Sequence, residues 1–175
     1  MFLFLLIVFL GLSFDRLNVF RYCIASCIIH ERGHIIAYRL YTSKWPEISV
    51  SIFGFKMKNN VLFNKNRNKI IFSGPAANLI CAIIALIFTN FIFTLKLYIF
   101  ACINFFIFFF NILPVYYLDG GQILYNKYQF YQNNFKYISA FSLLLFCVML
   151  YTFTDNQLLL TLPFIYYIIN ILNDI

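Results

Sequence analysis

Long apolar runs separated by short polar segments make up most of this 175-residue chain. Several of these runs approach the roughly 20 apolar residues that a helix needs to cross a bilayer. We predict six membrane-spanning helices, at about residues 1–14, 18–41, 69–93, 97–118, 137–153 and 158–172. The pattern therefore predicts an all-α polytopic membrane protein, in which the first run is short for a complete span.

The polar segment at residues 42–68 has a different pattern. Apolar and polar residues alternate over 48–53, residues 58–60 (Lys-Asn-Asn) are typical of a turn, and 61–63 are apolar again. We therefore expect a short membrane-associated β-hairpin after the second span. No internal repeat or linker interrupts the chain, so residues 1–175 are expected to form a single domain.

The composition excludes two broad classes of protein. Of all residues, 63% are hydrophobic and 11% are charged, whereas soluble domains carry about 25% charged residues and disordered chains are poor in apolar residues. The net charge of +7 is expected to set membrane orientation, and no nucleic-acid partner is predicted. The five cysteines all lie in apolar runs, as expected for buried thiols rather than a disulfide framework.

Basic residues are distributed unevenly between the segments that alternate across the membrane. With the N-terminus inside, the cytoplasmic segments hold nine of them, namely Arg39, Lys44, Lys56, Lys58, Lys65, Arg67, Lys69, Lys127 and Lys136. The outer segments hold three, namely Arg16, Arg21 and Lys96. The positive-inside rule then predicts that both termini face the cytoplasm.

The second run contains the sequence His30-Glu31-Arg32-Gly33-His34. Two histidines four residues apart lie one turn apart on one face of a helix, where both can bind one zinc ion, and Glu31 can act as a general base. The alternative is an ordinary pair of buried histidines, with Glu31 paired to Arg32. We favour one zinc ion per chain, because the chain's only two histidines both lie in this motif and ionisable residues at bilayer depth are usually functional.

A catalytic zinc ion also needs a third protein ligand. Four of the six acidic residues are predicted at span ends or in loops, namely Asp15, Glu47, Asp155 and Asp174. Asp119 remains, at the cytoplasmic end of the fourth run and near the expected depth of His34. An aspartate there could instead cap the following helix. We predict His30, His34 and Asp119 as metal ligands, with Glu31 as the catalytic residue.

Two asparagines and two cysteines have weaker predicted roles. Asn78 and Asn111 could bind the substrate or stabilise an oxyanion, although an interhelical hydrogen bond is the alternative for both. Cys23 and Cys27 continue the histidine face, but a closed Cys/His zinc site leaves no position for water, so core packing is favoured.

Three motifs in order resemble the site-2 proteases, a family of intramembrane zinc metalloproteases. They are the H-E-x-x-H sequence at 30–34, Gly-Pro-x-x-Asn at 74–78 and Asn-x-x-Pro-x-x-x-x-Asp-Gly-Gly at 111–121. The short chain without a CBS or PDZ domain looks most like the branch that contains stage IV sporulation protein FB.

The resemblance implies a zinc metalloendopeptidase of the bacterial cytoplasmic membrane. It further implies regulated intramembrane proteolysis of a membrane-bound protein such as a sporulation sigma-factor precursor, with membrane proteins as regulators. It also implies that the hairpin receives an extended substrate by strand addition.

Competing functions can be judged from the residues that they would need. An aspartyl protease needs a second intramembrane aspartate, and a serine protease needs a histidine that is not a metal ligand. A metal-handling protein or a scaffold without proteolytic activity remains as the alternative. Glu31 distinguishes the two readings, because a pair of metal ligands alone has no need of an adjacent base.

Overall fold

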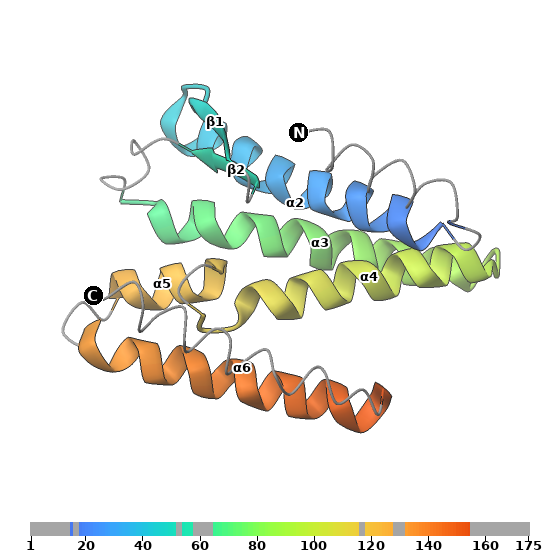
Figure 1. Ribbon diagram of the computed structural model, residues 1–175. Coiled ribbons are helices and arrows are strands. Elements are labelled where there is room, and N and C mark those ends of the chain that lie inside the picture. Colours follow the sequence, from blue (N-terminus) through green and yellow to red (C-terminus); the bar gives the residue numbers. More distant parts are fainter. Residues whose placement is uncertain are drawn as a thin grey trace. The chain divides into compact units, whose positions relative to one another are not determined.

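The computed structural model describes residues 15, 18–51, 54–57, 65–115, 118–127 and 132–154. Within these ranges the elements are α2 (Val19–Thr42), β1 (Ile48–Ser51), β2 (Gly54–Met57), α3 (Arg67–Thr89), α4 (Leu95–Ile112), α5 (Asp119–Lys127) and α6 (Gln132–Thr154) (Figure 1). The predominantly helical fold predicted from the sequence is therefore confirmed. The chain divides into two compact units, Met1–Phe109 and Phe110–Ile175, and the boundary falls within α4.

In the first unit, α2 packs extensively against α3. The buried residues of α3 include small or polar ones three or four positions apart, namely Gly74, Asn78, Ala82 and Ala85. The buried residues of α2 are Ser26, His30, His34, Ala37 and Tyr38. Small residues let two helix backbones approach closely. The contact therefore places both histidines of α2 against α3.

Aromatic and basic side chains lie together where α2 ends and α3 begins. The guanidinium carbon of Arg39 lies 5.1 Å from the centre of the Trp45 ring. The ammonium nitrogen of Lys69, in the first turn of α3, lies 5.6 Å from the centre of the Tyr41 ring. Such cation–π pairs of amphipathic side chains are typical of the boundary between lipid and water.

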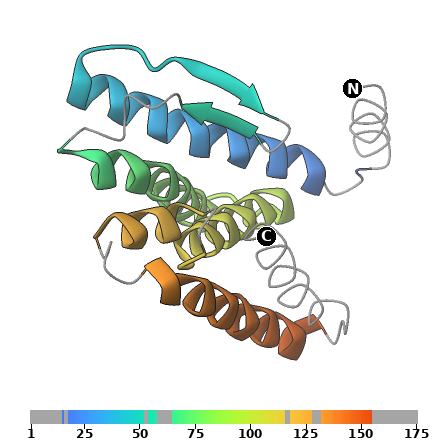
Figure 2. The ribbon, with the colours of Figure 1, turned by 60° about the vertical axis from the view of Figure 1, so that its left-hand side comes forward.

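The segment after α2 contains an antiparallel strand pair, in which Ile48 is opposite Met57 and Ser51 is opposite Gly54. Figures 1 and 2 show this pair beside α2. The strand that pairs with β1 is therefore β2, at 54–57, and not the expected segment 61–63. Residues 54–57 again alternate between apolar and polar types. Each strand contributes four residues to the pair. Residues 58–64 lie outside the described ranges.

In the second unit, α4 ends at Ile112 and not at the predicted residue 118. Pro114 has no backbone N–H and disfavours a helical conformation in the residue before it, so the helix cannot continue. The Ser139 hydroxyl of α6 donates a 2.9 Å hydrogen bond to the Pro114 carbonyl. The segment after α4 is thus fixed to α6.

A small apolar cluster and one additional helix complete the second unit. The cluster consists of Val115, Leu143 and Cys147, with Leu113 and Leu118 packed against it. The additional helix is α5, which lies between the fourth and fifth predicted spans, where no helix was predicted. Its first residue is Asp119.

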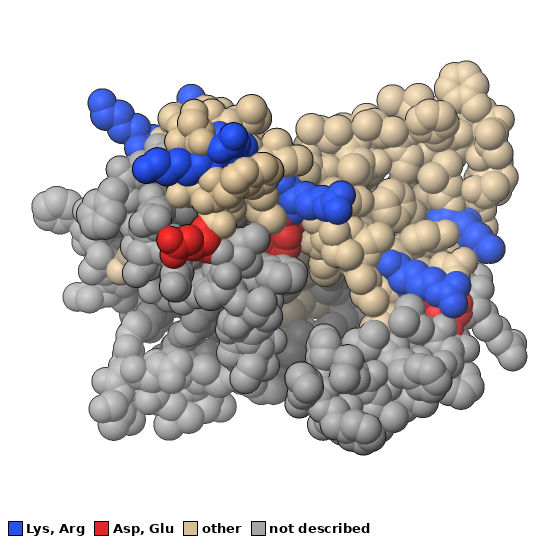
Figure 3. Space-filling view, turned by 90° about the horizontal axis from the view of Figure 1, so that it is seen from above, with Lys and Arg blue, Asp and Glu red and all other residues tan. Residues whose placement is uncertain are grey.

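By length and composition, α3 and α4 could each cross a membrane. These are the third and fourth of the six predicted spans. The apolar part of α6, Tyr137–Val148, is shorter, and α2 carries four charged residues, Arg21, Glu31, Arg32 and Arg39. The first and sixth predicted spans lie outside the described residues, so six spans remain a prediction. On the face in Figure 3, uncharged residues form most of the described surface, with basic side chains in small groups among them.

Candidate metal centre

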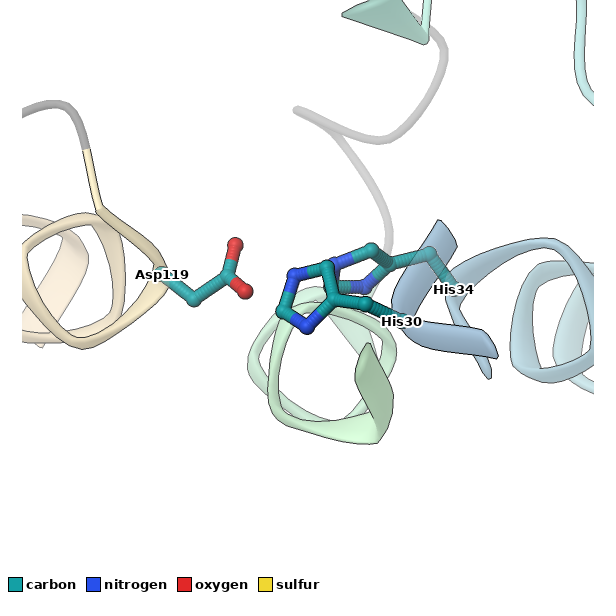
Figure 4. A group of neighbouring side chains, drawn as sticks. All are labelled: His30, His34 and Asp119. Carbon is teal, nitrogen blue, oxygen red and sulfur yellow. The ribbon is translucent and has the colours of Figure 1, made fainter. Parts of the chain in front are cut away.

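His30 and His34 project from successive turns of α2, and their imidazole rings lie side by side (Figure 4). Each residue is only 8% exposed. The two Nε2 atoms are 3.2 Å apart, and the ring planes are inclined at 85°. The spacing of four residues has therefore brought one nitrogen from each ring to the same point, as the sequence predicted for a metal-binding pair.

The opposite nitrogen of each ring contacts an oxygen of α3. His30 Nδ1 is 2.9 Å from the side-chain oxygen of Asn78, and His34 Nδ1 is 2.9 Å from the main-chain carbonyl oxygen of Ile70. An amide or carbonyl oxygen only accepts hydrogen bonds, so each Nδ1 must carry the proton and donate it. In the neutral rings, each Nε2 then presents a lone pair.

The Asn78 amide orientation is determined by two further contacts. Its nitrogen lies 3.0 Å from the Ser26 carbonyl oxygen and 2.8 Å from the side-chain oxygen of Asn104. A flipped amide would place its oxygen against the Ser26 carbonyl oxygen, with no proton between them. The oxygen of Asn78 therefore faces His30, and the Nδ1-protonated form of His30 follows from the hydrogen bonds.

Two lone pairs that face each other at 3.2 Å repel unless a proton or a cation lies between them. Zinc binds histidine nitrogen at about 2.05 Å, and two such nitrogens at a tetrahedral angle are about 3.3 Å apart. Asn78 and the Ile70 carbonyl act as the outer hydrogen-bond acceptors that orient histidine ligands in metal sites. The geometry of these two residues therefore fits a zinc ion.

Gly74 provides the space that the His34 ring occupies. A Cβ atom on Gly74 would overlap three atoms of that ring, including Nε2. Next to it, the Ser73 hydroxyl lies 2.6 Å from the Ile70 carbonyl oxygen and 2.9 Å from the Gly33 carbonyl oxygen. The Gly-Pro-x-x-Asn sequence of α3 thus contributes both the space for one histidine and the acceptor for the other.

The remaining predicted site residues lie in different parts of the chain. Glu31 follows His30 on α2 and is half-buried, and Arg32 is exposed. Asn111, in the last turn of α4, and Asp119, the first residue of α5, are half-buried residues of the second unit. An acidic side chain in a first helical turn is favoured by the helix dipole, so the local structure of Asp119 also fits the capping alternative.

The cysteine alternative gains no support from the structure. Cys27 is exposed and Cys23 is half-buried. Within the described residues, neither cysteine belongs to a group of three or more possible metal ligands. The prediction of a buried core thiol is therefore wrong for Cys27, because this residue lies on the exposed side of α2.

Asn104 was not predicted as a site residue, yet it is fully buried and contacts Asn78. A signal was present in the sequence. Asn104 lies seven residues before Asn111 in an otherwise mostly apolar helix, and this spacing places the two amides on one face of α4. A buried amide in such a helix must have hydrogen-bond partners.

The chain was compared with known families and proteins. Residues 90–150 match the sequence model of peptidase family M50, a segment that includes Asn111 and Asp119 but not the histidines. A search of curated proteins gave no match. The fold is similar to that of a site-2 protease from Methanocaldococcus jannaschii, with a TM-score of 0.63 and 24% identity over 95% of this chain and 84% of the other. Part of the chain is thus similar to peptidase family M50, and the fold is similar to that of a site-2 protease.

Proposed function

We propose that this protein is an intramembrane zinc metalloprotease that hydrolyses peptide bonds of membrane-bound protein substrates. The observation that carries the proposal is the histidine pair, whose Nε2 atoms are 3.2 Å apart while each Nδ1 contacts an oxygen acceptor. An ordinary buried histidine has no need of a second imidazole facing it in this way. The family M50 match and the fold support the same conclusion.

Asp119 is proposed as the third metal ligand, with His30 and His34 as the other two. This ligand is proposed from the sequence, in which Asp119 is the acidic residue at the end of the fourth apolar run. Two imidazoles and one carboxylate, with one position left for water, are a known ligand set of catalytic zinc. Zinc bound there would polarise the substrate carbonyl group and lower the pKa of a water molecule to about 7.

Glu31 is proposed as the general acid–base. It follows His30 directly on α2, so it is rotated by about 100° from that histidine and does not share its ligand position. Its carboxylate would accept the proton of the attacking water and deliver it to the leaving amine. Asn111 remains a proposed contact for the substrate backbone or the oxyanion.

Asn78 is given a different role from the one predicted. Its nitrogen contacts Ser26 and Asn104, and its oxygen contacts His30. These contacts use the amide for orientation of the histidine, so we propose that Asn78 orients His30 rather than binding substrate.

The membrane location is proposed from α3 and α4 together with the fold. We propose a multi-pass protein of the bacterial cytoplasmic membrane with both termini in the cytoplasm, and the basic residues support this orientation. A sporulation sigma-factor precursor is the first substrate to test, because the sequence resembles that branch of the family. The strand pair is the proposed place where an extended substrate adds.

The test compares two variants in cells that co-express membrane-tethered candidate precursors. Glu31→Gln keeps the size of the side chain but cannot accept a proton, so zinc content should stay normal while cleavage falls by about 10²- to 10⁴-fold. His34→Ala should lose both zinc and cleavage. Normal cleavage by zinc-loaded Glu31→Gln would exclude the proposed mechanism and favour the metal-handling alternative.

A further inference from the structure

Two buried asparagines connect α4 to the histidine pair of α2. Asn104 of α4 accepts a 2.8 Å hydrogen bond from the Asn78 amide of α3, and Asn78 accepts one of 2.9 Å from His30. The Asn104 amide in turn donates a 2.9 Å hydrogen bond to the Phe100 carbonyl of its own helix. Both asparagines are 0% exposed. A continuous series of hydrogen bonds therefore runs from the backbone of α4 to a proposed metal ligand.

The direction of every hydrogen bond in this series is fixed by carbonyl oxygens at its ends. The Phe100 carbonyl can only accept, so the Asn104 nitrogen faces it and the Asn104 oxygen faces Asn78. The Ser26 carbonyl oxygen accepts the second proton of the Asn78 amide. Only the Asn78 oxygen is then left for His30, whose Nδ1 must carry the proton.

The two histidines are held in different ways. The acceptor for His34 is the main-chain carbonyl oxygen of Ile70, which is present whatever side chain that residue carries. The acceptor for His30 is a side chain, Asn78, which needs its own partners to keep its orientation. Those partners are Asn104 and the Ser26 carbonyl oxygen, so a substitution at Asn104 should affect the protonated nitrogen of His30 and not that of His34.

We propose that Asn104 is a positioning residue for the metal site. It holds the Asn78 amide in the orientation that keeps His30 protonated on Nδ1, which leaves Nε2 for the metal. This inference rests on the proposed metal-binding function, and Asn104 acts through Asn78 without touching the histidines. The competing explanation is that Asn104 only joins α3 to α4 by an interhelical hydrogen bond.

The first measurement uses metal-free protein with ¹⁵N-labelled histidine in lipid nanodiscs. The chain has only two histidines, and a His34→Ala variant assigns their signals. Wild-type protein should show both rings protonated on Nδ1. In Asn104→Leu, a substantial fraction of His30 should lose the proton from Nδ1, while His34 stays unchanged.

A conservative variant and a matched control accompany the leucine substitution. Asn104→Asp keeps an oxygen that can accept from Asn78 and, as a neutral carboxyl group, a donor for the Phe100 carbonyl. It should restore the wild-type signals of His30. The control is Thr89→Val, which removes a hydroxyl bonded to the Leu86 carbonyl within α3 and should change neither ring.

The second measurement is zinc affinity in a double-mutant cycle. Asn78→Leu should weaken zinc binding by about 10- to 100-fold, as expected for an outer partner of a metal ligand. Asn104→Leu should weaken it by on the order of threefold to tenfold, the equivalent of one net hydrogen bond. Because Asn104 acts through Asn78, the double variant should bind zinc no more weakly than Asn78→Leu alone.

Two results would overturn the proposal. One is an unchanged His30 in folded Asn104→Leu together with a changed His30 in Asn78→Leu. The other is an additive loss of zinc affinity in the double variant, as expected for a residue that only supports packing. A wild-type protein that binds no zinc would instead refute the proposed function. The metal-free measurement would still show whether Asn104 determines which ring nitrogen of His30 carries the proton.

Discussion

The substitution Gly74→Ala tests whether the space beside His34 is required for metal binding. The added Cβ atom would overlap the His34 ring, and the ring would have to move by about 1 Å to reach ordinary carbon–carbon contact. Metal–ligand distances tolerate only about 0.2 Å. We therefore expect His34 to leave the ligand set and its Nδ1 to lose the 2.9 Å contact with the Ile70 carbonyl oxygen.

The expected loss of zinc affinity follows from the displacement of the His34 ring. Disturbing an outer partner of a metal ligand costs about 10- to 100-fold in affinity, so displacing the ligand itself should cost more than about 100-fold, or roughly 2.7 kcal/mol. Overpacking should also destabilise the fold by about 1–3 kcal/mol. The higher helix propensity of alanine offsets about 1 kcal/mol of that loss.

Gly33→Ala is the matched control, because it adds the same methyl group to the same helix pair. Its Cβ would lie 2.5 Å from the Ser73 carbonyl oxygen and 2.9 Å from the Ala77 Cβ, and the atoms that it meets belong to α3 rather than to a histidine ring. Gly33→Ala should lower the thermal unfolding midpoint about as much as Gly74→Ala does. Zinc affinity, measured by competition with a chelator of known affinity, should be at least tenfold higher than in Gly74→Ala.

Two outcomes would contradict this reasoning. If both variants lose zinc equally, the loss reflects a general separation of the two helices. If Gly74→Ala binds zinc normally, the His34 ring has another position from which it can bind the metal. Far-ultraviolet circular dichroism of both variants establishes that each remains folded.

Three further expectations concern stability and topology. Ser139→Ala removes the donor to the Pro114 carbonyl and should lower the free energy of unfolding by about 1–3 kcal/mol. Ser142→Ala removes a hydrogen bond within α6 and should lower it less. Equal losses in thermal unfolding would refute a special role for Ser139. Ala82→Leu places a large side chain where the wild-type residue is 0% exposed and should destabilise by about 1–3 kcal/mol, which an unchanged melting curve would contradict. A single cysteine at Asn60, in a cysteine-free background, should react with a membrane-impermeant reagent only from the cytoplasmic side, and labelling from outside would reverse the topology.

Sequence patterns predicted α3, α4 and the histidine pair because each depends on residues close together in the chain. A long apolar run specifies a helix through its length, and a spacing of four residues specifies a shared face whatever the helix contacts. In each of these cases the information is local.

The features that were missed depend on contacts between distant residues or on weak local signals. Helix α5 begins Asp-Gly-Gly, and glycine is a poor helix former, so propensity argued against a helix there. Asn104 and Asn78 are 26 residues apart, and no local pattern pairs them. The sequence between β1 and β2 has no typical turn residues, so β2 at 54–57 was not expected as the partner of β1.

The polar character of α2 has a consequence for how the protein enters the membrane during synthesis. Charged residues such as Glu31 and Arg32 each add about 2.5–3.5 kcal/mol to the cost of inserting a helix when they lie near its centre. A helix with four charged residues would therefore be retained poorly if it left the translocon alone. Helix α3, which is strongly apolar and packs along α2, follows it in the chain. If α2 spans the membrane as proposed, the two helices should leave the translocon as a pair. Helix α2 would then depend on α3 for insertion as well as for the orientation of its histidines.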